Sequence, residues 1–272
     1  MAGQTGSGAR ARVMGIVNVT PDSFSDGGRL ASVEGAVDHA LRLIEAGADI
    51  LDIGGESTRP GADPVSEAEE LDRVLPVVEG VRARWDGPIS IDTMKPAVAR
   101  AAVAAGATIW NDVFGLRADG ATETAAALGC EVVLMHMQGS PRTMQANPAY
   151  DDVVEEVAAW LAERAEAVIG AGVARERIWL DPGLGFGKTA HHNLQLLRGL
   201  PRLKGLGFPV LVGASRKRTI QAIDPMASDP LDRLGGSLAL HLFAASRGAD
   251  VIRCHDVRET VQALKVWAAL EG

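Results

Sequence analysis

Polar and charged side chains recur in this sequence at the points where short runs of β-branched residues end. They are Asn18, Asp52, Glu56, Asp92, Asn111, Asp112, His136, Asp181, Ser215, Lys217, Arg253 and His255. Carboxylates can accept hydrogen bonds from ring N–H groups and stabilise a developing positive charge, and amides can both donate and accept. One Asp after a strand is ordinarily a turn or helix-cap residue, but the recurrence along the whole chain indicates a shared pocket.

A second set of residues is suited to binding an anion. Residues 54–61 (GGESTRPG) offer hydroxyl groups, a guanidinium and open backbone amides. Arg253 and His255 follow the last β-branched run, where arginine provides a bidentate fork and protonated histidine a further donor. The alternative is that these two residues are surface charges near the last helix.

The elements that must position these residues alternate regularly between strand and helix patterns. Strands are expected at residues 13–19, 50–53, 89–92, 108–112, 131–135, 178–181, 210–213 and 251–253. Helices are expected at residues 32–46, 66–84, 96–105, 122–128, 150–171, 191–197, 231–247 and 257–270. Ser66 with Glu69 is a helix-start signal, and Gly47, Gly106 and Gly248 stand where helices should end.

Eight strand–helix units predict an α/β fold, a single (β/α)8 TIM barrel. The barrel should comprise residues 13–272, and residues 1–12 should be a disordered leader. In such a barrel the carboxyl ends of all strands meet at one face, and phosphate is often bound after the last strands. A doubly wound sheet is the alternative, but no G-x-G-x-x-G motif follows the first strand.

Composition excludes several classes of partner. The formal net charge is −8, so the basic excess of a nucleic-acid-binding surface is missing. No apolar stretch is long enough to span a membrane, so we expect no membrane partner. The two cysteines, Cys130 and Cys254, do not form a disulfide framework, which favours a reducing, cytoplasmic location.

Two long segments resemble signatures of the dihydropteroate synthase family. They are residues 17–28 (VNVTPDSFSDGG) and 52–61 (DIGGESTRPG). Shorter segments follow in the family's order: IDT at 91–93, NDV at 111–113, LMHM at 134–137, DPGLGFGKT at 181–189, SRK at 215–217 and RCHDV at 253–257. The resemblance runs from about residue 13 to the end, and the two long segments are its most specific part.

The resemblance implies a reaction. Members of this family join 6-hydroxymethyl-7,8-dihydropterin diphosphate to p-aminobenzoate, forming 7,8-dihydropteroate for folate biosynthesis and releasing diphosphate. Mg2+ assists, and diphosphate leaves before the arylamine attacks a stabilised pterin cation. The resemblance also implies a homodimer, which we expect to form through barrel helices late in the chain.

The resemblance assigns roles to individual residues. The catalytic residues would be Asp92, Asp181 and Lys217, and the pterin would be bound by Asp92, Asn111, Met135, Asp181 and Lys217. Diphosphate would be bound by Thr58, Arg59, Arg253 and His255, and Mg2+ by Asn18. The p-aminobenzoate would be bound by Phe186, Lys217 and Arg218. Two features depart from the family pattern. Arg218 stands where many members have Ser, and residues 114–117 (FGLR) replace a smaller turn, so the p-aminobenzoate site and its sulfonamide affinity stay open.

Three alternative functions remain. A methyltetrahydrofolate:corrinoid methyltransferase would share the fold and some acids, but would not need the diphosphate-binding loops. A Schiff-base aldolase would use Lys217, with its pKa lowered by Arg216 and Arg218. A non-catalytic paralogue would keep every residue needed for pterin binding and form no product.

Overall fold

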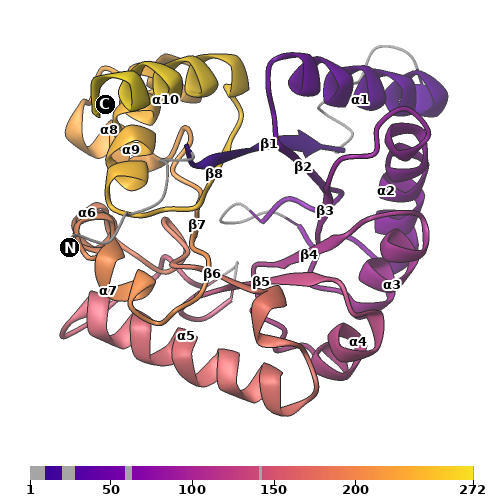
Figure 1. Cartoon of the computed structure of the whole chain (residues 1–272), viewed down its shortest axis with the longest axis horizontal. Coiled ribbons are helices and arrows are strands. Elements are labelled where there is room, and N and C mark those ends of the chain that lie inside the picture. Colours follow the sequence, from indigo (N-terminus) through magenta and orange to yellow (C-terminus); the bar gives the residue numbers. More distant parts are fainter. Residues whose placement is uncertain (1–9, 20–27, 59–62, 141–142, 272) are drawn as a thin grey trace, which may run out of the picture.

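The structure is a computed structural model that describes residues 10–19, 28–58, 63–140 and 143–271. Its strands are β1 (Arg12–Asn18), β2 (Ile50–Gly54), β3 (Ile89–Asp92), β4 (Ile109–Asp112), β5 (Glu131–Met135), β6 (Ile178–Asp181), β7 (Leu211–Val212) and β8 (Val251–Cys254). They form one parallel sheet in the order β6-β5-β4-β3-β2-β1-β8-β7, and a parallel bridge between Leu180 and Val210 joins its two ends. The predicted (β/α)8 TIM barrel is therefore confirmed, and Figure 1 looks down it.

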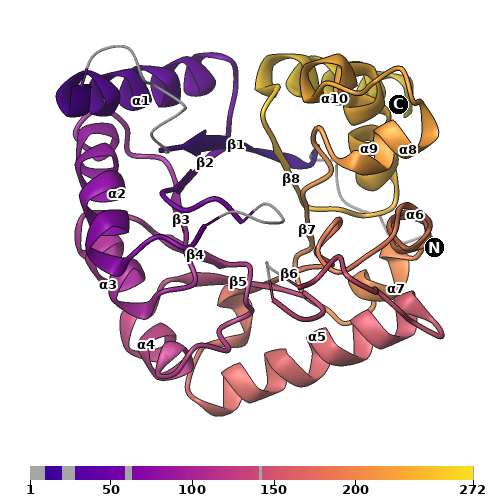
Figure 2. The ribbon, with the colours of Figure 1, turned by 180° about the vertical axis from the view of Figure 1, so that it is seen from behind.

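Helices surround this ring of strands, as the reverse view in Figure 2 also shows. They are α1 (Gly28–Glu45), α2 (Glu67–Arg82), α3 (Pro96–Ala104), α4 (Ala121–Leu128), α5 (Val153–Gly170), α6 (Ala190–Arg198), α7 (Leu200–Lys204), α8 (Arg218–Ile223), α9 (Leu234–Ser246) and α10 (Val257–Glu271). No helix in the described ranges is long and apolar enough to cross a membrane.

The predicted helix boundaries follow local chemistry. The hydroxyl of Ser66 accepts a hydrogen bond from the backbone N–H of Glu69 at 3.2 Å, which starts α2. Gly47, Gly106 and Gly248 have φ values of 100°, 114° and 95°, a backbone conformation that glycine adopts without a Cβ clash. These positive φ values turn the chain from the end of each helix toward the next strand.

Some elements differ from the predicted ones. The helix expected at 231–247 is divided into a short 3-10 turn (Pro230–Arg233) and α9, and α7 and α8 were not predicted. The barrel also begins before residue 13. Arg12 already belongs to β1, and Arg10 makes a two-point ion pair with Asp49 at 2.9 and 3.0 Å. Residues 1–9 of the predicted leader lie outside the described residues.

The barrel interior has an apolar layer beneath a polar one. The apolar layer is a buried cluster of Met14, Ile50, Ile109, Val133, Trp179, Leu211 and Val251. Alternate residues of a strand point to the same side. The residues two positions after five members of this cluster are Asp52, Asn111, Met135, Asp181 and Arg253. The strands thus place the predicted functional side chains in one inward-facing layer at their carboxyl ends.

Candidate active site

An acid–guanidinium cluster lies at the centre of the polar layer. Nε of Arg253 is 2.5 Å from Oδ2 of Asp52, and its Nη2 is 2.7 Å from Oδ2 of Asp92. Asn111 donates from Nδ2 to the carboxylate of Asp52 at 3.3 Å. Asp52 is fully buried and was not predicted to bind substrate. Its position two residues after Ile50 is the sequence signal that it faces inward.

This cluster contains two carboxyl groups but one guanidinium, so its acids are only partly neutralised. Burial raises the pKa of Asp92 to about 7, because Asp52 adds to the effect and Arg253 only partly opposes it. Burial alone would lower the pKa of Arg253, but the attraction of Asp52 and Asp92 outweighs burial and raises it. Oδ1 of Asp92 is buried and has no hydrogen-bond partner among the described residues. A buried acceptor without a donor is costly, so this atom is suited to a donor on a ligand.

Asp181 provides a second acid in the same layer. It pairs in strand register with Met135, and its Oδ1 accepts the backbone N–H of Gly183 at 2.7 Å. Burial raises the pKa of Asp181, while the Gly183 N–H and the nearby Lys217 oppose that rise. The contact with Gly183 fixes the orientation of the carboxylate beside Lys217.

Apolar side chains gather beside these acids. Val113, Met135, Met137 and Met144 form a buried cluster, and Phe186 packs against it. Nζ of Lys217 lies 4.5 Å from the centroid of the Phe186 ring, within range of a cation–π contact. The structure thus brings Met135, Phe186 and Lys217 together. Arg218 is the exposed first residue of α8, next to Lys217.

The other predicted anion-binding residues differ in how far the structure describes them. Nδ1 of His255 is 3.0 Å from the hydroxyl of Ser215. Burial, together with Arg216 and Arg253, lowers the pKa of His255 to about 3, which favours a neutral ring over the predicted protonated imidazole. Its Nε2–H can still donate if Ser215 donates to Nδ1. Thr58 is half-buried after β2, and Arg59 lies outside the described residues.

The segment that departs from the family pattern is held firmly. Both carboxylate oxygens of Asp112 accept backbone N–H groups, from Phe114 at 2.7 Å and from Leu116 at 2.8 Å. The guanidinium of Arg117 stacks 4.0 Å from the Phe114 ring centroid. Phe114 packs against the same apolar cluster as Phe186, so this segment forms part of one wall of the site.

Asn18, the predicted Mg2+ ligand, is exposed at the carboxyl end of β1. Within the described ranges, no group of three or more His, Cys, Asp or Glu residues could hold a metal ion. Mg2+ commonly takes one or two protein oxygens and fills its other positions with phosphate oxygens and water. An exposed amide oxygen at the same end of the barrel as the predicted diphosphate-binding residues fits that mode of binding.

Comparisons with known proteins identify the family to which this chain belongs. Residues 14–255 match the family of pterin binding enzymes. Dihydropteroate synthase of Escherichia coli (strain K12) is 52% identical over 257 residues, which cover 94% of this chain and 90% of that protein. The enzyme of Haemophilus influenzae is 49% identical over 259 residues, covering 95% of this chain and 93% of that protein.

Solved structures extend the likeness to three dimensions. Dihydropteroate synthase of Xanthomonas albilineans with 4-aminobenzoic acid has a TM-score of 0.91 and 56% identity, covering 97% of this chain and 94% of that one. The complex of the Xanthomonas albilineans enzyme with 7,8-dihydropteroate has a TM-score of 0.88 and 53% identity, with the same coverage. The chain therefore belongs to the pterin binding enzymes and, within them, to the dihydropteroate synthase family.

Proposed function

We propose that this chain transfers the 7,8-dihydropterin-6-ylmethyl group from 6-hydroxymethyl-7,8-dihydropterin diphosphate to p-aminobenzoate. The products are 7,8-dihydropteroate and diphosphate. The observation that carries this proposal is the buried Oδ1 of Asp92, which has no hydrogen-bond partner among the described residues. Asp92 lies in the same inward-facing polar layer as Asp181 and Asn111. The donor edge of a pterin, with its amino group and ring N–H, supplies the missing hydrogen bond.

The bound pterin lies among the acids and the apolar cluster. Asp92 and Asp181 accept hydrogen bonds from its donor edge. Asn111 binds the edge that carries both donors and acceptors, because an amide both donates and accepts. Met135 provides an apolar wall, and Lys217 donates to the ring beside Asp181. The same two carboxylates stabilise positive charge on the pterin, which favours an SN1-like reaction.

Departure of diphosphate comes first in this reaction. The C–O bond between the pterin methylene and the diphosphate breaks, and its electron pair leaves with the diphosphate. Arg253, Thr58, Arg59 and the neutral His255 donate to the leaving group, and bound Mg2+, held by Asn18, would neutralise part of its charge. Arg253 contacts Asp52 and Asp92, so it links the leaving group to the acids that stabilise the cation.

The arylamine then completes the transfer. The amine nitrogen of p-aminobenzoate attacks the methylene, a C–N bond forms, and one amine proton is lost. Phe186 and Lys217 lie in contact and form the proposed site for the aromatic ring, with the exposed Arg218 at its edge. Exclusion of water is needed because water would otherwise capture the cation.

A single assay tests the proposed function. Purified protein receives the pterin diphosphate and Mg2+, and free diphosphate is measured before and after p-aminobenzoate is added. We expect sustained release to depend on p-aminobenzoate, because the arylamine captures the cation and allows the next turnover. Pterin binding without release would instead identify a non-catalytic paralogue. Methyl transfer to cobalamin, or borohydride trapping of Lys217 with a carbonyl substrate, would support the other two alternatives.

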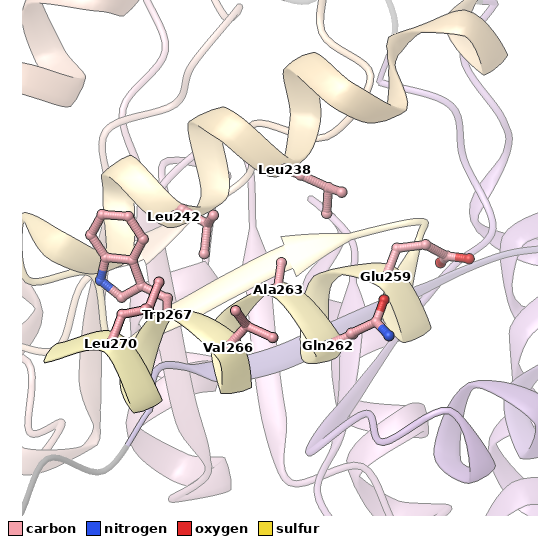
Figure 3. Close-up of a pocket in the computed structure, with 8 residues that line it drawn as sticks. All are labelled: Leu238, Leu242, Glu259, Gln262, Ala263, Val266, Trp267 and Leu270. Carbon is pink, nitrogen blue, oxygen red and sulfur yellow. The ribbon is translucent and has the colours of Figure 1, made fainter. Parts of the chain in front are cut away.

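We place the expected homodimer interface on α9 and α10, with a second copy of this chain as the partner. The groove between these helices is lined by Leu238, Leu242, Glu259, Gln262, Ala263, Val266, Trp267 and Leu270 (Figure 3). Val266 is 56% exposed and Leu270 78% exposed, and such apolar patches commonly mark interfaces. Light scattering at micromolar concentration should give a dimer, and Val266→Glu with Leu270→Glu should give a monomer. The cytoplasmic location stays a prediction.

A further inference from the structure

Two buried polar residues, His136 and Lys188, have no role in the proposed reaction. Lys188 is 3% exposed, and its Nζ lies 2.9 Å from Nδ1 of His136. The same Nζ donates to the carbonyl oxygens of His136 at 3.2 Å and of Phe186 at 2.9 Å. Burial lowers the pKa of Lys188 to about 7, and burial together with Lys188 lowers the pKa of His136 to about 3. The imidazole is therefore neutral.

These three contacts do not depend on the charge of Lys188. A charged ammonium donates to Nδ1 and to both carbonyl oxygens, whereas a neutral amine donates to the two carbonyls and accepts from Nδ1–H. The ring of His136 packs edge-on against Trp160, with centroids 5.1 Å apart and an interplanar angle of 88°. The pair is thus a fixed contact between the end of β5 and the loop that follows β6.

That loop, residues 182–189, lies directly on the backbone that follows β5. A Cβ added at Gly183 would be 2.0 Å from the carbonyl oxygen of His136, and one added at Gly187 would be 2.7 Å from that of Gln138. Both glycines have positive φ, 66° and 64°. Glycine is required at both positions because any side chain would push the two segments apart.

Two further side chains hold the loop from its outer side. The hydroxyl of Tyr150 donates to the carbonyl oxygen of Gly187 at 2.9 Å, and Nε2 of Gln145 donates to that of Gly185 at 2.6 Å. Both come from the segment between β5 and α5, as His136 does. Lys188 returns hydrogen bonds into this segment from the buried side.

The loop carries Phe186 between these anchors. Its carbonyl oxygen is held by Lys188, and its ring lies 4.5 Å from Nζ of Lys217. We propose that Lys188, bound to His136, is a positioning residue that holds Phe186 against Lys217 and so sets the p-aminobenzoate site. The proposal rests on the proposed function. Asp181 depends less on Lys188, because β6 positions its backbone and Gly183, whose N–H it accepts, lies at the start of the loop. Lys188 also acts on Asp181 through its charge, which opposes the rise that burial causes in the pKa of that carboxyl.

The test compares Lys188→Met, which removes every donor at nearly constant length, with Lys265→Met on the exposed face of α10. Each variant is measured for KM toward p-aminobenzoate and for Kd toward the pterin diphosphate without p-aminobenzoate. A misplacement of about 1 Å can cost up to about 100-fold. For Lys188→Met we expect KM to rise about tenfold and Kd to stay within about threefold, with Lys265→Met at wild-type values. Equal increases in KM and Kd, or an unchanged KM, would overturn the proposal.

A milder variant covers the case in which Lys188→Met does not fold. Tyr150→Phe removes only the outer bond to Gly187, so we expect KM for p-aminobenzoate to rise about threefold, because a single hydrogen bond is lost. Amide hydrogen exchange of residues 183–188 should be faster in both variants. Unchanged exchange would contradict the positioning role of Lys188, whatever the enzyme assay shows. Failure of the wild type to release diphosphate would instead refute the proposed function.

Discussion

Nη2 of Arg253 lies 2.7 Å from Oδ2 of Asp92, so a residue predicted to hold diphosphate is ion-paired with one predicted to hold the pterin. The same guanidinium contacts Asp52, which leaves one cation facing two buried acids. Burial and the second acid together raise the pKa of Asp92. A pterin bound at Oδ1 of Asp92 would bring donors to this excess of acceptors, and substrate binding would thereby stabilise the cluster.

The main effect of Arg253→Met should be a loss of protein stability rather than a loss of affinity for one substrate. The substitution leaves Asp52, which is fully buried, and Asp92, which is 12% exposed, without their cation, and loss of one partner of a buried ion pair costs about 3–5 kcal/mol. Urea unfolding at fixed protein concentration measures the free energy of unfolding. Adding Asp52→Asn should restore part of the loss. A change below about 1 kcal/mol in the single variant would show that the acids do not depend on Arg253.

Pterin binding should strengthen as the pH rises through about 7. The form of Asp92 that accepts a ring N–H is the carboxylate, and burial holds the pKa of this group at about 7, so protonation removes the acceptor below that pH. Calorimetry with a dihydropterin that lacks diphosphate measures the affinity without titrating phosphate groups. Asp92→Asn should weaken binding about tenfold to 100-fold at pH 8 and abolish the inflection. An identical pH profile in the variant would assign the titration to another group.

Asp112→Asn and Asp181→Asn should separate stability from binding. Asp112 uses both oxygens on backbone N–H groups, so its substitution should cost about 1–3 kcal/mol of stability and change pterin affinity less than threefold. Asp181 has one oxygen on Gly183, so its substitution should weaken pterin binding about tenfold or more. Thermal unfolding and calorimetry on both variants check this. The opposite pattern would show that Asp112 contacts the substrate.

The arrangement of the site was largely predictable because strand geometry repeats. Ile50 and Val251 belong to the apolar interior layer, and side chains two residues further along must face the same interior. This rule places Asp52 and Arg253 inside the barrel without any knowledge of the ligand. It also explains why polar residues that are distant in sequence meet at one face.

Pairings and charge states could not be predicted from the same pattern. The hydrogen bond between His136 and Lys188 joins two loops, and no periodicity specifies how loops pack. The neutral state of His255 results from burial beside Arg216 and Arg253, which depends on packing in three dimensions. Arg253 was assigned to diphosphate alone because its contacts with acids from β2 and β3 appear only when the barrel closes.

The loop after β2 has an anchor of its own, formed by Lys95, Glu56 and Glu70. Nζ of Lys95 lies 2.5 Å from a carboxylate oxygen of each acid, and Glu56 also accepts the backbone N–H of Val65 at 3.2 Å. Glu56 thus connects the two ends of the segment that contains Thr58. Lys95→Met should loosen this segment and weaken diphosphate binding about fivefold by calorimetry. It should also cost about 3 kcal/mol of stability, since Glu70 is fully buried.

Lys204→Met is the matched control for this prediction. Lys204 pairs with Asp250 at 2.7 Å, but both side chains are about a third exposed, at 35% and 37%. Exposed pairs contribute about 0–1 kcal/mol, so this variant should lose little stability. Asp250 precedes β8 and therefore lies at the opposite end of the barrel from the site, so diphosphate affinity should not change. If Lys95→Met bound diphosphate as tightly as Lys204→Met does, the ion pairs of Lys95 would serve stability alone and Thr58 would be positioned without them.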